Sequence, residues 1–107
     1  MIINGILKIK FFVPKTFHVG YSTKYVTRIT FKFRTGKSYI GFFEPITSME
    51  LYLFDVEYLV NVVFPWYDDE LLILFKQGVA DVGTIELCLG TRIIGQAELY
   101  SYELVDE

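Results

Sequence analysis

Five basic side chains occupy alternate positions in two β-like segments of the sequence. Apolar residues fill the positions between them, so the cations fall on one face of each segment and the apolar side chains on the other. Cations arranged in this way bind phosphates and other anions, including single-stranded RNA where aromatic rings lie nearby. The candidate RNA- or anion-binding residues are Lys8, Lys10, Arg28, Lys32 and Arg34. We expect one cationic stripe if the two segments are neighbouring strands.

Three other features have the residue types of catalytic or nucleotide sites without the rest of the motif. Gly36-Lys37-Ser38 matches the end of a phosphate-binding loop, but Phe31 stands where the motif requires its first glycine, so we predict no nucleotide. His18 has no nucleophile motif beside it, which favours a loop residue over a catalytic base. Cys88 is expected on the outward phase of its strand as a structural residue, because a reactive thiol needs a nearby cation.

Asp68, Asp69 and Glu70 are the candidate ligands for a metal ion. They lack the spaced ligands and the glycine of a calcium loop, so a helix start or a solvated turn is the favoured interpretation. We therefore predict no metal, no cofactor and no enzymatic activity. A small enzyme that uses His18 or this acidic cluster is the alternative.

The 107 residues suit one domain over residues 1–107, and a hydrophobic share of 52% excludes a disordered chain. The chain has one cysteine and one histidine, so neither an internal disulfide nor a Cys/His zinc site can form, which favours a reducing, cytoplasmic location. No export signal is visible, and the apolar runs are far shorter than a membrane span requires, so no membrane association is predicted.

Charge is segregated along the chain. Residues 1–43 hold eight of the ten basic residues and no acid, whereas residues 44–107 hold all thirteen acids and two basic residues. One interpretation is an anion-binding patch beside an acidic flank. The other is that basic and acidic strands pair across a sheet and neutralise each other.

Apolar residues alternate with polar ones through most of the chain, which predicts strands with one buried face. We place inward Leu7, Ile9, Phe11 and Val13 in the first strand, and Ile85, Leu87 and Leu89 in a later one. Close spacing of strands predicts an all-β sandwich or barrel. The predicted strands are 6–13, 26–35, 38–43, 49–54, 56–64, 83–89 and 92–102, with a loop over 14–24.

The segment from Pro65 to Asp81 departs from this alternation. Three acids precede an apolar run, Lys76 follows it and Gly78 ends it, which is the charge order of a short helix. The run Leu-Ile-Leu-Phe also permits a strand. We expect one short helical or irregular insertion near 66–81, and residues 68–78 are left open between helix and strand.

Three collinear motifs resemble the C-terminal β-barrel of elongation factor Tu and related translational GTPases. They are Arg28-Ile-Thr-Phe-Lys-Phe-Arg-Thr35 followed by Gly36 and Gly41, Asp55-Val-Glu-Tyr-Leu-Val-Asn-Val-Val-Phe-Pro65, and Ile85-Glu-Leu-Cys-Leu-Gly-Thr-Arg-Ile-Ile-Gly95. The resemblance runs from about residue 6 to residue 99 and implies a single six-stranded antiparallel barrel. Cys88 and Leu89 replace the Arg-Glu pair that lies near the tRNA contact in that family, and no GTPase domain accompanies the barrel.

The resemblance therefore implies a stand-alone, non-catalytic binding module that docks a protein or ribonucleoprotein partner. An immunity-like or decoy role against a toxin that engages translation factors is one version of this hypothesis. The candidate protein-interface residues are Trp66, Tyr67, Tyr100 and Tyr102, because aromatic side chains dominate interface energetics. An RNA-binding protein that uses the basic strand face is the alternative, and monomer and homodimer both stay open.

Overall fold

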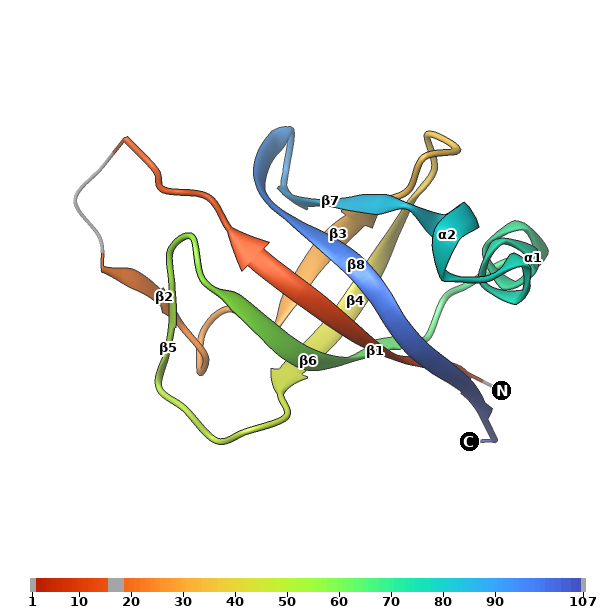
Figure 1. The fold of residues 1–107 in the computed structure, drawn as a ribbon, viewed down its shortest axis with the longest axis horizontal. Helices are drawn as coiled ribbons and strands as arrows, with labels where there is room; N and C mark the ends of the chain where they lie inside the picture. The colour runs from red at the N-terminus through yellow and green to blue at the C-terminus, as the bar shows by residue number, and fades with distance from the viewer. Residues whose placement is uncertain (1, 16–18, 107) are drawn as a thin grey trace.

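The computed structural model describes residues 2–15 and 19–106, most of which lie in strands. Two short helices interrupt the strands in the second half of the chain (Figure 1). In chain order the elements are β1 (Ile2–Phe11), β2 (Gly20–Ser22), β3 (Arg28–Lys32), β4 (Ser38–Pro45), β5 (Leu51–Leu53), β6 (Glu57–Phe64), α1 (Asp69–Gln77), α2 (Val79–Val82), β7 (Thr84–Leu89) and β8 (Arg92–Val105).

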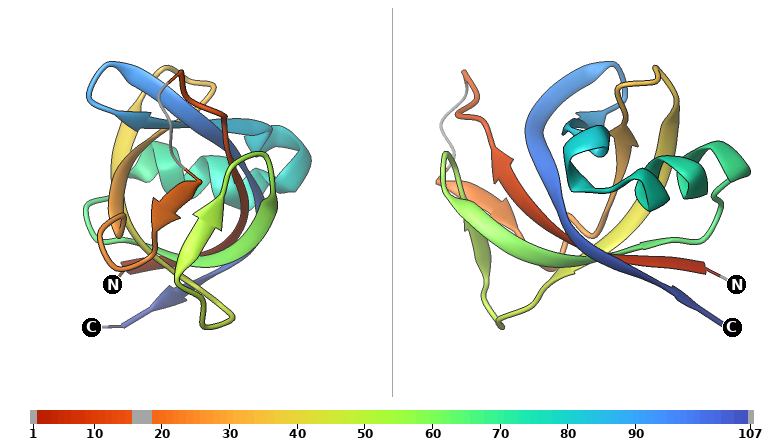
Figure 2. Two further views of the ribbon diagram at one scale, coloured as in Figure 1. Left: turned by 90° about the vertical axis from the view of Figure 1, so that its left-hand side faces the viewer. Right: turned by 45° about the vertical axis from the view of Figure 1, so that its right-hand side comes forward.

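Six of these strands form a closed barrel in the order β1-β6-β4-β3-β7-β8, and every pairing is antiparallel. The long strand β8 curves around the barrel and closes it by pairing with β1 (Figure 2). Closure leaves the six strands with no free edge over most of their length, which satisfies their backbone hydrogen bonds. The predicted six-stranded antiparallel barrel is confirmed.

The barrel interior is filled by the apolar phase of each strand. Leu7, Ile9 and Phe11 of β1 are buried, as the alternation predicts. Phe31 of β3 lies at the centre, with the Phe43 and Phe64 rings edge-on to it at centroid distances of 6.2 and 5.2 Å. Edge-to-face contacts at these distances are favourable because the positive edge of one ring meets the negative face of another.

The first strand ends at Phe11, two residues earlier than the sequence predicts. Val13 was expected inside, but it is 69% exposed. The Phe12 amide donates to the carbonyl of Ile94, and beyond this point the chain leaves the barrel. Pro14 has no amide hydrogen to extend the pairing. Val13 therefore lies outside the buried face.

A β-bulge between Leu87 and Cys88 corrects a second expectation. Leu87 pairs with Gly95 and Cys88 with Ile93, so the extra residue is Ile94 of β8, opposite this point of β7. At this register shift Cys88 is buried instead of outward, and Leu89 is 39% exposed instead of inward. Local alternation did not indicate this shift.

The segment near 66–81 forms two helices, so the helical interpretation of residues 68–78 is correct. Asp68 caps α1 by accepting a hydrogen bond from the amide of Leu71 at 3.0 Å. Leu71, Leu74 and Phe75 form its buried face, and the Phe75 ring lies among those of Phe33, Phe64 and Tyr102. Helix α1 therefore packs its apolar side against the core of the barrel.

A two-stranded sheet of β2 and β5 lies beside the opposite end of the barrel from α1 (Figure 1). Residues 20–22 were predicted as loop, and β2 forms only because it pairs with residues 51–53. Tyr52 of β5 is fully buried, and its ring contacts those of Phe11, Phe43 and Tyr58. This tyrosine extends the hydrophobic core under the small sheet.

Candidate functional site

The predicted cationic stripe does not form as one surface. Lys8 and Lys10 lie on β1, Arg28 and Lys32 on β3, and Arg34 follows β3. Two other strands separate β1 from β3 in either direction around the barrel. The five cations therefore lie on opposite sides of the barrel. A single stripe required β1 and β3 to be neighbouring strands, and they are not.

The two lysines of β1 pair with acids from the second half of the chain. Lys8 lies 3.6 Å from a carboxylate oxygen of Glu57, and Lys10 lies 3.9 Å from one of Asp55. On the other side of the barrel, Lys32 of β3 is directly opposite Glu86 of β7 in register. These relationships support the interpretation that basic and acidic strands neutralise each other across the sheet.

The four candidate interface aromatics also divide between two sides. Trp66 is 65% exposed and Tyr100 is 64% exposed. Trp66 packs at a tilt of 60° against Phe42 of β4. Tyr100 belongs to β8, and two strands separate β4 from β8 in either direction. Tyr67 and Tyr102 are partly buried and pack against the core. Trp66 belongs to a larger exposed cluster around Phe42.

That cluster, which we term the Phe42 face, comprises Arg28, Phe42, Val63 and Trp66. Arg28 of β3 is directly opposite Phe42 of β4, and Phe42 is directly opposite Val63 of β6. The Arg28 guanidinium lies 6.0 Å from the centroid of the Phe42 ring, and the Trp66 ring lies 5.9 Å away from it. The face thus combines a cation, a phenylalanine and a valine on three adjacent strands with a tryptophan that follows β6.

A shallow depression of about 250 Å³ adjoins the Phe42 face. Phe42 is 38% exposed at its wall, and Glu44 and Asn61 add polar groups. Two adjacent phenylalanines in the sequence indicate this surface. Phe42 and Phe43 are adjacent in an alternating strand, so one of the two rings has to point outward.

The acidic cluster is part of the fold and not a separate site. Asp68 accepts hydrogen bonds from the Tyr39 hydroxyl at 2.6 Å and the Lys37 ammonium at 2.9 Å, and Lys37 also lies 2.8 Å from Glu70. The bond from Tyr39, then those from the Leu71 amide and Lys37, hold the pKa of Asp68 well below its usual range. Within residues 2–15 and 19–106, no group of acids, histidine or cysteine is arranged to hold a metal ion.

The same network accounts for Lys37, the lysine of the incomplete phosphate-loop motif. Hydrogen bonds to Glu70 and then to Asp68 raise its pKa. Burial, followed by the bond to Asp68, raises the pKa of the Tyr39 hydroxyl. Lys37 is thus engaged by the first turn of α1 instead of facing an open loop.

Cys88 is not placed as a reactive nucleophile. Cys88 is buried, and burial, followed by the charge of Glu86, raises the pKa of its thiol. A raised pKa disfavours the thiolate that a nucleophile needs. His18 lies outside the described residues.

Comparison with known proteins identified no relative of this chain. No protein-family model and no curated protein matches this sequence. The resemblance to the elongation factor barrel therefore rests on its three motifs and stays a prediction. In the described part of the chain, neither helix is long and apolar enough to cross a membrane. The fold defines a small closed β-barrel protein with an aromatic and basic face.

Proposed function

We propose that this protein is a non-catalytic binding module that docks a protein partner on the Phe42 face. One observation carries the proposal: Trp66, which is 65% exposed, packs its ring at a tilt against an exposed phenylalanine that also lies beneath an arginine. Tryptophan and arginine are the residue types most enriched among those that dominate binding energy at protein interfaces.

The arrangement of the face supports a protein ligand. Arg28, Phe42 and Val63 come from three neighbouring strands of a closed barrel, and Trp66 follows the last of these strands by two residues. The spacing of the three strand residues is fixed before binding, so little ordering cost falls on them in the complex. The depression beside Phe42 is of a size to receive apolar side chains from a partner. Arg28 and Glu44 carry opposite charges near it, which would orient the partner.

The resemblance to the elongation factor barrel gives this proposal its specific form. A stand-alone barrel of that type would dock a protein or ribonucleoprotein of translation, and an immunity-like or decoy role is the more specific version. Growth rescue by this protein, when it is co-expressed with a toxin encoded beside it, tests that version. Failure of rescue would leave the docking proposal intact and reject the decoy role.

Affinity capture from cell lysate with matched variants tests the docking proposal. We expect the unmodified protein to retain a stoichiometric protein partner, and Trp66→Ala and Phe42→Ala each to weaken its binding by about 2 kcal/mol or more. Tyr100→Ala is the control, because Tyr100 has the same exposure as Trp66 on the other side of the barrel. Circular dichroism establishes that each variant is folded.

The outcomes separate specific docking from nonspecific adhesion. Equal loss of the captured protein in Trp66→Ala and Tyr100→Ala would indicate that any exposed aromatic suffices, which contradicts the proposal. Retention by all three variants would place the partner on another surface and would also contradict it.

A further inference from the structure

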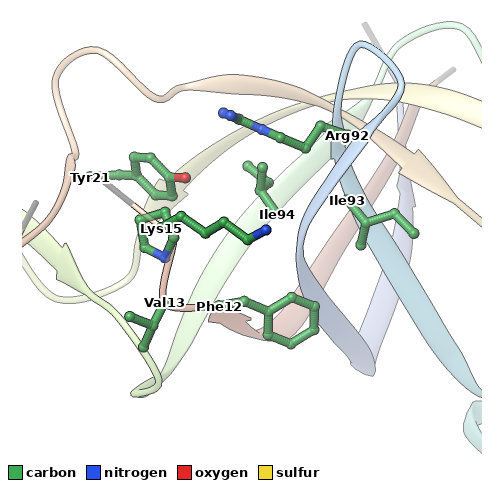
Figure 3. A pocket seen from close by; sticks show the side chains of 8 residues that line it. Phe12, Val13, Lys15, Tyr21, Arg92, Ile93 and Ile94 are labelled. Atoms are coloured by element: carbon green, nitrogen blue, oxygen red, sulfur yellow. The ribbon is translucent and has the colours of Figure 1, made fainter. Parts of the chain in front are cut away.

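A second surface feature lies where the chain leaves β1 and β8 begins. It is a cleft of about 410 Å³ (Figure 3). Phe12 and Val13 form one wall, and Ile93 and Ile94 form the other. The Phe12 amide still bonds to the carbonyl of Ile94 at 2.8 Å, and the cleft opens beyond that bond, where the two segments separate.

The polar groups of the cleft are a tyrosine and two cations. Lys15 and Arg92 reach it from the two separating segments, and Tyr21 of β2 lies at its side (Figure 3). No carboxylate lines the cleft, and within the described residues neither cation has an acidic oxygen within 4.0 Å. Lys8, Lys10 and Lys37 have such partners, whereas several other surface cations of the described chain do not. Lys15 and Arg92 differ from those other cations in that both border one apolar cleft.

We propose that this cleft binds a small organic carboxylate that carries an apolar chain. Its volume falls in the range of small-molecule sites, which are mostly apolar with a few polar groups that fix orientation. The apolar walls would hold the chain, while the guanidinium of Arg92 and the ammonium of Lys15 would pair with the carboxylate. A ligand without the chain would leave the exposed side chains of Phe12, Val13 and Ile93 uncovered, and one without the charge would leave two cations unpaired.

The inference is independent of the proposed function. None of the residues of the Phe42 face lines the cleft, which lies between β1 and β8 instead of on β3, β4 and β6. A partner could dock on the Phe42 face whether or not the cleft is occupied.

Titration with octanoate, followed by NMR chemical shifts of the backbone amides, tests the proposal. We expect saturable changes at Phe12, Val13, Ile93 and Ile94, and an affinity that falls as salt is added. The neutral analogue 1-octanol should bind about tenfold more weakly, since a charge-assisted pair contributes roughly 1.4 kcal/mol or more. Inorganic phosphate, which has charge but no chain, should also bind more weakly than octanoate.

Charge variants locate the binding site. Arg92→Gln and Lys15→Gln should each weaken octanoate binding about fivefold to tenfold, because each removes one charged partner of the carboxylate. Lys76→Gln removes the same charge from helix α1, outside the cleft, and should leave the affinity unchanged. Arg92→Lys keeps the charge but loses the planar fork, so it should bind with intermediate affinity.

Three results would overturn the inference. They are absence of saturable octanoate binding in the millimolar range, equal affinity for octanoate and 1-octanol, and shift changes confined to other parts of the barrel. Phosphate binding as tight as that of octanoate would likewise reject the apolar chain as part of the ligand.

Discussion

The Tyr39 hydroxyl donates a 2.6 Å hydrogen bond to Oδ1 of Asp68, a residue 29 positions later in the chain. The same oxygen accepts the amide of Leu71 and so caps helix α1. One carboxylate therefore starts the helix and also ties it to strand β4 of the barrel. This bond fixes where the helical insertion begins relative to the sheet.

Tyr39→Phe should destabilise the protein by about 1.5 kcal/mol, because it removes a hydrogen bond to a charged group from a side chain that is only 8% exposed. Urea denaturation measures the loss. Tyr25→Phe is the matched control, since Tyr25 is 85% exposed, and its substitution should leave the free energy of unfolding unchanged. An equal effect of both changes would show that the Tyr39 bond is not the cause.

Stability should fall in acid through Asp68. Its folded pKa lies below its ordinary value, so its contribution is present above the unfolded pKa of about 4 and is lost as the pH falls through the folded pKa. Asp68→Asn removes this titration. The variant should be less stable at neutral pH, and its stability should change less than that of the original protein below pH of about 4. Parallel acid curves for the two proteins would argue against this role.

Tyr52→Phe should stabilise the protein by about 1 kcal/mol at neutral pH. The Tyr52 hydroxyl is buried and has no hydrogen-bond partner within the described residues, so its removal relieves a desolvation penalty. Burial, followed by the charge of Glu44, raises the pKa of Tyr52 to about 12. Above pH of about 10 this tyrosine ionises in the unfolded chain but not in the folded protein. The stability linked to its titration is therefore complete below pH of about 10 and is lost as the pH rises towards 12.

The alkaline arm of this experiment has its own expected result. Tyr52→Phe should lose less stability than the original protein when thermal denaturation is followed from pH 10 upward. A clear loss of stability at neutral pH in the variant would mean that the hydroxyl has a favourable partner.

Gly95→Ala should destabilise the barrel by about 3 kcal/mol, because the added Cβ would overlap the carbonyl oxygen of Lys10 and lie 3.1 Å from the Cα of Phe11. Backbone atoms of a paired strand cannot move aside without cost. Gly36→Ala is the comparison, since Gly36 has a positive φ of 90° but no atom within 4 Å of the added carbon. It should cost only about 1 kcal/mol, measured by urea denaturation. Equal costs at both positions would contradict the steric explanation.

The alternative hypothesis of RNA binding now has a limit that can be measured. Of the five candidate cations, three share one side of the barrel: Arg28 and Lys32 on β3, and Arg34 two residues after it. For a single-stranded RNA held there, a plot of log affinity against log salt concentration should have a slope no steeper than about −2. Arg28→Glu should weaken such binding, whereas Lys8→Glu on the other side should not. Fluorescence anisotropy at several salt concentrations gives the slope. A slope near −4 would restore the joint action of all five cations.

Much of the barrel is predictable from local sequence, because the alternation of apolar and polar residues indicates which face of a strand is buried. Ile29, Phe31 and Phe33 are buried, and Arg28, Lys32 and Arg34 on the other phase are exposed, as the period of two requires. The flanking charges and Gly78, whose φ of 109° favours glycine, indicated a helix over 68–78, but the local sequence also permitted a strand. The bulge at Leu87 and Cys88 was not predictable, because it depends on how β7 meets β8.

The sequence by itself determined that this chain forms strands with one apolar and one charged face, since that property depends on neighbours two residues apart. Only the tertiary structure decided which strands are adjacent, because pairing joins residues that are distant in the chain and must close the barrel around one core. Because of this strand order, Lys8 and Arg28 lie on opposite sides of the barrel and Trp66 contacts Phe42. Lys15 and Arg92 likewise border the same cleft.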